Sequence, residues 1–297
     1  MNATTTTEAA PAPRKQSESL WSKAVGKFLR DRWGMASLLV VLVYLGIALG
    51  VWAGLWGTDW NTLTPTINAE ASAEHWFGTN RNGQDIFERA IFSTKTAFEI
   101  GLVVAILSTI LGAVMGAISG FFAGRWPDEI ILWLKGVLDS IPFYLFVAAV
   151  AFALQGYAFS MHVAMVATFW TTTARLVRAE VIRLKGFEFV EAAHALGVPE
   201  LRIISRHIIP NTTHILLVQA TITFVSAIKS EVILSFLGLG VKNGVSWGLM
   251  ISESTNEVTT GFFNNFLAAS AFLFVLVMAF NMFSDALQDA LDPKKTG

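Results

Sequence analysis

Ionisable residues at or within long apolar runs are the side chains of this sequence that could do chemistry, and they are Glu99, Lys229 and Glu231. A charge inside an apolar layer is costly, so such residues often mark a pathway for an ion or substrate. Lys229 and Glu231 lie two positions apart, about 200° around a helix, so their side chains do not face each other. Two placements stay open for this pair: the outer end of a helix, at the interface or against a partner subunit, or the lining of a pathway.

The sequence lacks the residue patterns that hydrolytic, redox or metal chemistry requires. The chain contains no Cys, which excludes thiolate ligands and a thiol nucleophile. Its five His residues are scattered, without the spacing of a metal site, and no Ser, His and Asp form a catalytic set. No G-x-x-x-x-G-K-[ST] loop is present to hold ATP phosphates. We therefore expect no enzyme activity and no metal or cofactor in this chain.

Composition indicates a polytopic membrane protein. Of the 297 residues, 54% are hydrophobic and only 14% are charged, whereas soluble domains carry about 25% charged residues. Six apolar runs are long enough to cross a membrane as helices, so we expect an all-α fold with six transmembrane helices. These runs lie near 35–56, 97–123, 137–155, 159–177, 212–235 and 264–284.

The chain divides into three expected regions. Residues 1–34 combine a disordered tail, which is not a cleavable signal, with a basic amphipathic segment, "WSKAVGKFLRDRW", suited to anionic lipid and not to nucleic acid. Residues 35–74 hold the first transmembrane helix and an outer loop, and residues 75–297 form the main membrane domain. Most Lys and Arg residues fall on the side of the N-terminus, which places both termini and the segment 178–211 in the cytoplasm.

Glycines recur every four residues in the second apolar run, at Gly112, Gly116, Gly120 and Gly124. On a helix this spacing makes one nearly bare ridge that another backbone can approach closely. Two interpretations stay open. The ridge packs against another span of this chain, or it forms a seam with a second subunit or along a pathway.

A polar stretch between two apolar runs, "FEFVEAAHALGVPELRIISRHIIPN" (187–211), predicts a helix, a glycine turn and a second helix. Gly197 is placed to end the first helix, and Pro199 suits the start of the second. In the second helix Leu201, Ile204 and Ile208 share one face, which predicts an amphipathic helix at the membrane surface. Pro210 is expected to break or kink the chain before the fifth apolar run.

This stretch resembles the EAA loop of permease subunits in bacterial ATP-binding-cassette (ABC) importers. That pattern reads E-A-A, three residues, G, nine residues, I, one residue, L-P. The matching residues are Glu191, Ala192, Ala193, Gly197 and Pro210. The chain departs from the pattern with His207 for Ile and Ile209 for Leu, although "RHIIPN" is typical of the peptide-importer branch.

Three further stretches are similar to the oligopeptide and dipeptide branch of this family: 75–92, 230–251 and 281–293. The first, "HWFGTNRNGQDIFERAIF", follows the pattern H-x-F-G-T-D-x-x-G-R-D-x-x-S-R. Asn80, Gln84 and Glu88 replace its Asp, Arg and Ser, which bears on whether the substrate is a standard peptide. In the second, Glu231 matches the Glu of E-x-x-L-S-F-L-G-L-G.

The resemblance implies a permease subunit in the bacterial inner membrane that works with a second permease chain. Two separate ATPase subunits would bind ATP and Mg, and a solute-binding protein would deliver the substrate. Residues 187–197 would form the coupling helix, in which Glu191 accepts a charge-assisted bond, Ala192, Ala193 and Ala195 allow close docking, and Gly197 makes a tight turn. On the outer side, Trp247 would contact the binding protein or anchor at the interface.

Two alternatives remain at this point. An importer for nickel or another small solute uses the same type of permease, and its selectivity rests largely on the binding protein. A self-sufficient secondary carrier is the rival from a different class of transporter, and it predicts internal repeats and buried carboxylates that coordinate ions. The two halves of this sequence share no evident pattern.

Overall fold

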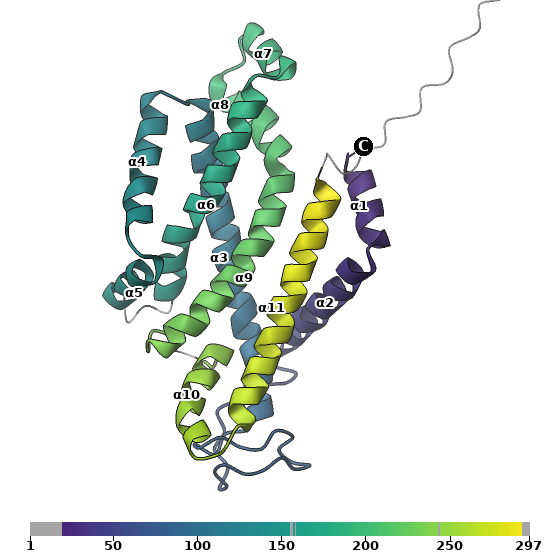
Figure 1. Ribbon diagram of the computed structural model, residues 1–297, viewed down its shortest axis with the longest axis vertical. Coiled ribbons are helices and arrows are strands. Elements are labelled where there is room, and N and C mark those ends of the chain that lie inside the picture. The colour runs from purple at the N-terminus through teal and green to yellow at the C-terminus, as the bar shows by residue number, and fades with distance from the viewer. Residues whose placement is uncertain (1–19, 155–156, 158, 243, 293–297) are drawn as a thin grey trace, which may run out of the picture.

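Helices dominate the computed structural model, which describes residues 20–154, 157, 159–242 and 244–292 (Figure 1). Those residues contain no strand, only isolated bridges between Leu63 and Gln84 and between Thr79 and Asp85. The expected all-α class is confirmed. The helices are α1 (Leu20–Arg30), α2 (Arg32–Trp52), α3 (Ile86–Phe121), α4 (Trp126–Ser140), α5 (Phe143–Ala153), α6 (Ser160–Lys185), α7 (Glu188–Ala195), α8 (Glu200–Ile203), the π-helix η1 (Ile204–Ile208), the 3-10 helix η2 (Ile209–Thr212), α9 (Thr213–Phe236), α10 (Trp247–Thr259) and α11 (Asn264–Leu291).

Polar side chains fix where two of these helices begin. Asp85 accepts a hydrogen bond from the backbone N–H of Glu88 at 2.9 Å, at the start of α3. Ser246 accepts one from Leu249 at 3.1 Å, at the start of α10. Both use the first-turn N–H groups that a helix cannot satisfy internally.

The long helix α3 runs through the middle of the molecule, with α2, α6, α9 and α11 packed around it (Figure 1). One buried apolar cluster joins α2, α3, α9, α10 and α11. Within it the Tyr44 hydroxyl of α2 donates to the Phe272 carbonyl of α11 at 3.1 Å. The first apolar helix therefore packs into the same bundle as the rest, and the division at residues 34 and 74 stays a prediction.

The expected span 137–155 is wrong as a single helix. It is divided between α4 and α5, whose axes differ by 93°. Pro142 explains the break, because a residue before proline avoids helical backbone angles, and Ile141 has a ψ of 130°. Proline also lacks the N–H that would continue the helix.

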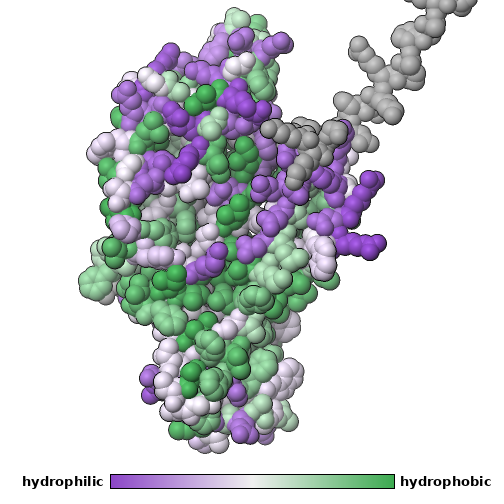
Figure 2. Space-filling model, in the orientation of Figure 1, coloured by the Kyte–Doolittle hydropathy of each residue, from purple (hydrophilic) through white to green (hydrophobic). Residues whose placement is uncertain are grey.

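Among the residues that the structure describes, four helical segments have the length and composition to cross a membrane: α2, α3, the path Glu200–Phe236 and α11. The bent pair of α4 and α5 makes a fifth if it counts as one span. Helix α6, which contains the expected span 159–177, is not among them, so the count of six stays a prediction. Figure 2 shows hydrophobic surface gathered across the middle of the molecule and hydrophilic side chains concentrated toward the α7 end.

Helix α1 corresponds to the expected basic amphipathic segment. It lies against the end of α11, where the rings of Phe28 and Phe283 meet edge to face at 5.8 Å and Ala24 is buried. Val25 and Leu29 stay exposed. The expected disordered tail, up to residue 19, lies outside the described residues. Both α1 and the last turns of α11 lie toward the α7 end, whereas α10 lies at the opposite end (Figure 1).

Candidate functional site

The segment that resembles a coupling helix forms α7, at one tip of the molecule (Figure 1). Glu191 and Ala192 point away from the bundle and are exposed. Val190 and Ala193, which are three positions apart and so share a face, are buried. The expectation that Ala193 offers a docking surface is wrong, because its methyl group packs inside this chain against the cluster that includes Ile203 and other residues near the tip.

Gly197 ends α7 as predicted. Its φ is +72°, in the left-handed region that glycine adopts without strain. The N–H of Gly197 donates to the His194 carbonyl at 2.9 Å, and the N–H of Val198 donates to the Ala193 carbonyl at 3.1 Å. These two bonds form a Schellman motif. A Cβ at Gly197 would meet nothing within 4 Å, so the backbone conformation alone requires glycine here.

Exposed apolar side chains accompany Glu191 on α7, at its C-terminal end and on α8. Phe189, Leu196 and Leu201 are 39%, 83% and 71% exposed. We call the set formed by Phe189, Glu191, Ala192, Leu196 and Leu201 the α7 surface. Ile204 and Ile208 are buried whereas Leu201 is exposed, and the amphipathic helix at the membrane surface stays a prediction. Ile204 begins the π-helix, which changes the register of the residues that follow.

The expected break at Pro210 is absent, because the chain stays helical there, and the expected kink stays a prediction. A helical path continues from Glu200 to Phe236 through the π-helix η1 and the 3-10 helix η2. The N–H of Ile209 reaches back to the Ile204 carbonyl, a five-residue step that absorbs the proline. The Asn211 side chain donates to the His207 carbonyl at 2.6 Å and satisfies a backbone group near the proline.

The inner side of α7 rests on the ends of α3 and α6. The His194 ring stacks on Phe121, with centroids 5.7 Å apart. Lys185, the last residue of α6, donates from Nζ to the Phe121 carbonyl at 2.7 Å. The first contact joins α7 to the end of α3, and the second joins the end of α6 to the same residue of α3.

Glycines of α3 make a close seam with α6. An added Cβ would lie 2.7 Å from the Trp170 carbonyl oxygen at Gly112, 2.5 Å from that of Ala174 at Gly116, and 2.7 Å from that of Arg178 at Gly120. Only hydrogen at these positions permits this backbone approach. The structure thus places the ridge between two helices of the same chain.

Gly124 does not belong to this seam, contrary to expectation. Helix α3 ends at Phe121, and Gly124 lies in the following turn with a φ of +76° and no atom within 4 Å of an added Cβ. The spacing of four residues continues in the sequence after the helix has ended.

An ion pair that sequence reasoning missed lies beside the seam. Arg178 of α6 donates from Nε and Nη2 to the two carboxylate oxygens of Asp128 of α4, at 2.9 and 2.8 Å. Ser119 of α3 also donates to Asp128. The two partners stand fifty positions apart, and only the early position of Asp128 in a helix beginning with Trp-Pro gives any local signal.

At the opposite end of the molecule, Glu231 is buried inside this chain. Its Oε1 accepts hydrogen bonds from Ser235 at 2.6 Å and Ser246 at 2.5 Å, which tie α9 to the start of α10. The expected interfacial placement of Glu231 is therefore wrong. Lys229 is exposed, and its role as an outer contact or pathway residue stays a prediction.

Trp247 is also a packing residue. Its side chain is 2% exposed, and its Nε1 donates to the Ala90 carbonyl of α3 at 3.0 Å. The expectation that Trp247 lies at the surface, against a binding protein or the interface, is wrong. The indole packs beside Tyr44 and Phe272 instead, where it buries a large apolar area.

The stretch 75–92 forms a polar network before and at the start of α3. Asn80 donates from Nδ2 to Gln84 Oε1 at 2.9 Å, so two residues that depart from the family pattern contact each other. Arg89 donates to the same Gln84 oxygen and pairs with Glu253 of α10 at 2.6 Å. Burial raises the pKa of the Glu253 carboxyl, an effect that the charge of Arg89 opposes.

Comparison with known proteins identifies the class to which this architecture belongs. Residues 108–297 match the family described as "Binding-protein-dependent transport system inner membrane component". The chain belongs to this family of membrane transport components.

Nothing in the part of the chain that the structure describes groups three or more His, Cys, Asp or Glu residues suitably for a metal ion.

Individual relatives cover almost the whole chain. It is 35% identical to the oligopeptide transport system permease protein OppC of Bacillus subtilis, over 94% of this chain and 92% of that protein. It is 32% identical to the dipeptide transport system permease protein DppC of the same organism, over 96% and 89%. Identity to OppC of Escherichia coli K12 is 34%, over 94% and 93%.

Proposed function

We propose that this chain is the membrane-spanning permease subunit of an ATP-driven importer that carries peptides across the bacterial inner membrane. Membership of the family supports the transport role, and the relatives named for oligopeptide and dipeptide transport support the substrate class. The observation that carries the mechanism is the α7 surface. It presents Glu191 and exposed apolar side chains beside a glycine-fixed turn, at the tip of an otherwise membrane-suited bundle.

The α7 surface docks onto an ATPase subunit. Leu196 and Phe189 are large, exposed apolar groups, and covering them with a partner would stabilise the complex. Glu191, which is also exposed, accepts a charge-assisted hydrogen bond from a basic group or helix N-terminus of that partner. ATP and Mg bind to two such ATPase subunits, since this sequence holds no phosphate-binding loop.

Motion of the docked tip passes into the bundle through α3 and α6. His194 and Lys185 fasten α7 and the end of α6 to Phe121 of α3. The glycine seam then holds α3 and α6 in backbone contact over several turns. A displacement of α7 driven by ATP therefore moves these two helices together, because a close-packed interface transmits strain instead of absorbing it.

The orientation of the chain in the membrane determines where the remaining partners bind. The α7 end, with α1 and the described end of α11, lies in the cytoplasm, and basic α1 lies on the lipid surface. The opposite end, with α10 and residues 75–92, receives a solute-binding protein. A second permease subunit completes the pathway.

Uptake in cells tests the proposal. Deletion of the gene abolishes uptake of labelled trialanine, and wild-type chain restores it. Glu191→Lys fails to restore uptake although the chain reaches the membrane, because a lysine repels the basic partner of Glu191. Glu129→Gln, at an exposed position on α4, restores uptake and is the control. Full uptake in the Glu191→Lys strain would contradict the docking role, and unchanged uptake after deletion would contradict peptide transport.

A further inference from the structure

One side of helix α9 is left largely uncovered by this chain, although α9 lies between α6 and α11 (Figure 1). Its opposite side is packed, with buried residues that include Phe224, Ala227, Glu231 and Leu234. The uncovered residues lie three or four positions apart and so share a face of the helix. We call this set the α9 face, and it consists of Val218, Ile222, Ser226, Lys229 and Ile233, each exposed or half-buried.

A groove of about 560 Å³ continues the α9 face toward the α7 end of the molecule. Val218 and Ile222 of the α9 face line it, together with polar side chains of α6 and α11 that include Glu180, Arg183 and Gln288. Its volume is within the range of pockets that hold small ligands. The mixture of apolar and charged side chains suits a surface that meets water and a solute, and not lipid tails alone.

Lys229 places a charge in the middle of the otherwise uncharged α9 face. Ile222 lies on one side of it along the helix and is 42% exposed, and Ile233 lies on the other side and is 39% exposed. None of the ion pairs found among the described residues includes Lys229. A charged side chain within an apolar layer is costly unless water or an opposite charge meets it. For Lys229, that water or opposite charge comes from outside the described part of this chain.

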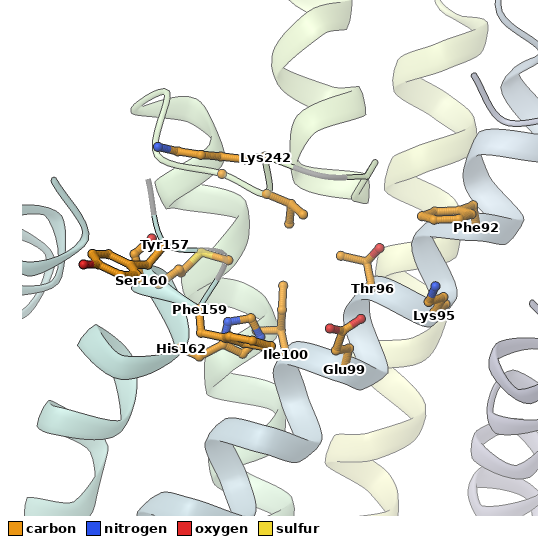
Figure 3. Close-up of a pocket in the computed structure, with 13 residues that line it drawn as sticks. Phe92, Lys95, Thr96, Glu99, Ile100, Tyr157, Phe159, Ser160, His162 and Lys242 are labelled. Atoms are coloured by element: carbon orange, nitrogen blue, oxygen red, sulfur yellow. The ribbon is translucent and has the colours of Figure 1, made fainter. Parts of the chain in front are cut away.

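Lys95 of α3 shows the contrast. It lines a cavity between α3 and the start of α6, together with Glu99 (Figure 3). Its Nζ lies over the Phe92 ring, 5.1 Å from the centroid, in a cation–π contact. Lys95 is thus held against an aromatic ring of its own chain, whereas Lys229 is exposed on the α9 face.

We propose that the α9 face lines the route by which a peptide crosses the membrane, and that Lys229 pairs there with a carboxylate of the passing peptide. The inference rests on the proposed function and adds a recognition element to it. A peptide with a free C-terminus carries at least one carboxylate, which accepts a charge-assisted hydrogen bond from a lysine ammonium. Ile222 and Ile233 flank this contact with apolar surface, which demands no particular hydrogen-bonding group of the peptide's side chains.

Accessibility of the α9 face to water is the first test. The chain contains no Cys, so single cysteines can be introduced at chosen positions. Ile222→Cys, Ser226→Cys and Ile233→Cys are compared with Leu42→Cys, which is 51% exposed near the middle of α2. Each variant is assembled with cysteine-free partner subunits in lipid nanodiscs, where both sides of the membrane are open. The probe is a negatively charged methanethiosulfonate, which does not enter lipid.

We expect the three cysteines of the α9 face to react and Leu42→Cys to stay unmodified. Peptide-loaded binding protein with ATP should change the rate of modification on the α9 face at least threefold. Failure of two or more of the three to react would overturn the route, and would indicate that lipid or the second permease covers this face. Equal reaction at Leu42→Cys would overturn it as well.

The role of Lys229 is tested by uptake into proteoliposomes that hold the full importer, with partner permease, ATPases and binding protein. The probes are labelled Ala-Ala-Ala, its C-terminal amide, and Ala-Asp-Ala amide, each supplied on saturating binding protein. Lys229→Gln is compared with Lys229→Arg, which keeps the charge, and with Lys242→Gln, which removes an exposed lysine outside the α9 face. Assembly of each complex and its basal ATPase activity report whether the variant has folded.

The proposal predicts that Lys229→Gln slows ATP-dependent uptake of Ala-Ala-Ala at least fivefold and uptake of its amide less than twofold. Lys229→Arg should retain most of the uptake of the free acid, and Lys242→Gln should not change the ratio of acid to amide. A loss confined to Ala-Ala-Ala supports pairing with the C-terminal carboxylate, and an additional loss for Ala-Asp-Ala amide supports pairing with any carboxylate.

An equal loss for Ala-Ala-Ala and its amide, or no loss for either, would overturn the pairing with Lys229. A wild-type importer that moves no peptide at all would instead refute the proposed function, and the inference with it.

Discussion

Arg178 of α6 forms a bidentate ion pair with Asp128 of α4, through hydrogen bonds from Nε to Oδ1 at 2.9 Å and from Nη2 to Oδ2 at 2.8 Å. The Gly124 N–H adds a third bond to Oδ2 at 2.9 Å, so the turn after α3 is included. Because α4 otherwise leaves much of its surface exposed, this pair is a main attachment of α4 to the bundle. It lies at the end of the glycine seam nearest to α7.

Removing the acid of this pair should destabilise the fold. In Asp128→Ala the Arg178 guanidinium loses its counter-charge in a partly buried site, which costs about 2–4 kcal/mol of unfolding free energy. Thermal unfolding of the purified chain in detergent measures the change. Asp139→Ala is the control, since Asp139 pairs with Lys135 and Arg175 at a more exposed site and these pairs are worth below about 1 kcal/mol. Equal shifts in both variants would contradict the role of the Arg178 pair.

The glycine seam predicts opposite effects for the same substitution at two helical glycines. In Gly116→Ala the new Cβ would lie 2.5 Å from the Ala174 carbonyl oxygen, so α3 and α6 must separate, at a cost of about 1–3 kcal/mol. In Gly136→Ala the Cβ meets nothing within 4 Å, and the lost chain entropy of glycine makes the change stabilising by about 0.5–1 kcal/mol. Chemical denaturation in detergent would show both signs. Stabilisation by Gly116→Ala would contradict the close packing.

The contact between Asn80 and Gln84 predicts that their effects are coupled. Asn80→Asp removes the donor to Gln84 Oε1 and sets two oxygens against each other, which costs about 1–3 kcal/mol. The Gln84 amide cannot turn over freely, because Arg89 needs the same oxygen. Adding Gln84→Arg restores an acid–base pair, so the double-mutant cycle should give a favourable coupling of about 0.5–3 kcal/mol. Additive effects would show that the two departures from the family pattern are independent.

Local features of the fold were readable from the sequence. Gly197 ends α7 because it adopts a left-handed backbone conformation that glycine accepts without strain. The residue type alone therefore signals the end of the helix. The basic segment before the first apolar run forms α1, since its amphipathic period lies within eleven residues. Pro142 is a similar local signal for the bend between α4 and α5. The length of the apolar run 137–155 had instead favoured one continuous helix.

Features that depend on tertiary contacts were not readable. Glu191 and Ala192 are exposed and Ala193 is buried, although the pattern E-A-A treats them as one unit. Trp247 resembles an interfacial tryptophan in sequence, but the Ala90 carbonyl and neighbouring rings bury it. Asp128 and Arg178 meet only because α3, α4 and α6 converge. Each of these outcomes is set by which helix lies alongside, which one sequence does not specify.

Gly197, in the turn after α7, and Gly124 can be substituted in parallel, because their backbone conformations are similar. Gly197→Asp and Gly124→Asp both place a side chain at a positive φ, +72° and +76°, in open space. The two should therefore lose similar amounts of stability, about 1 kcal/mol. Gly197 directly follows Leu196 of the α7 surface, whereas Gly124 lies in the turn after α3, so we expect the Gly197 variant to disturb docking and the Gly124 variant to leave it intact.

Co-purification tests the central claim, that the α7 surface couples this chain to an ATPase. The chain is tagged, extracted in mild detergent and analysed by mass spectrometry, as wild type, as Glu191→Lys combined with Gly197→Asp, and as Gly124→Asp. We expect ATPase subunits and a second permease to co-purify with the wild type and with Gly124→Asp, and the ATPases alone to be lost with the α7 variant. Recovery of the ATPases with the α7 variant, or their absence from the wild type, would contradict it.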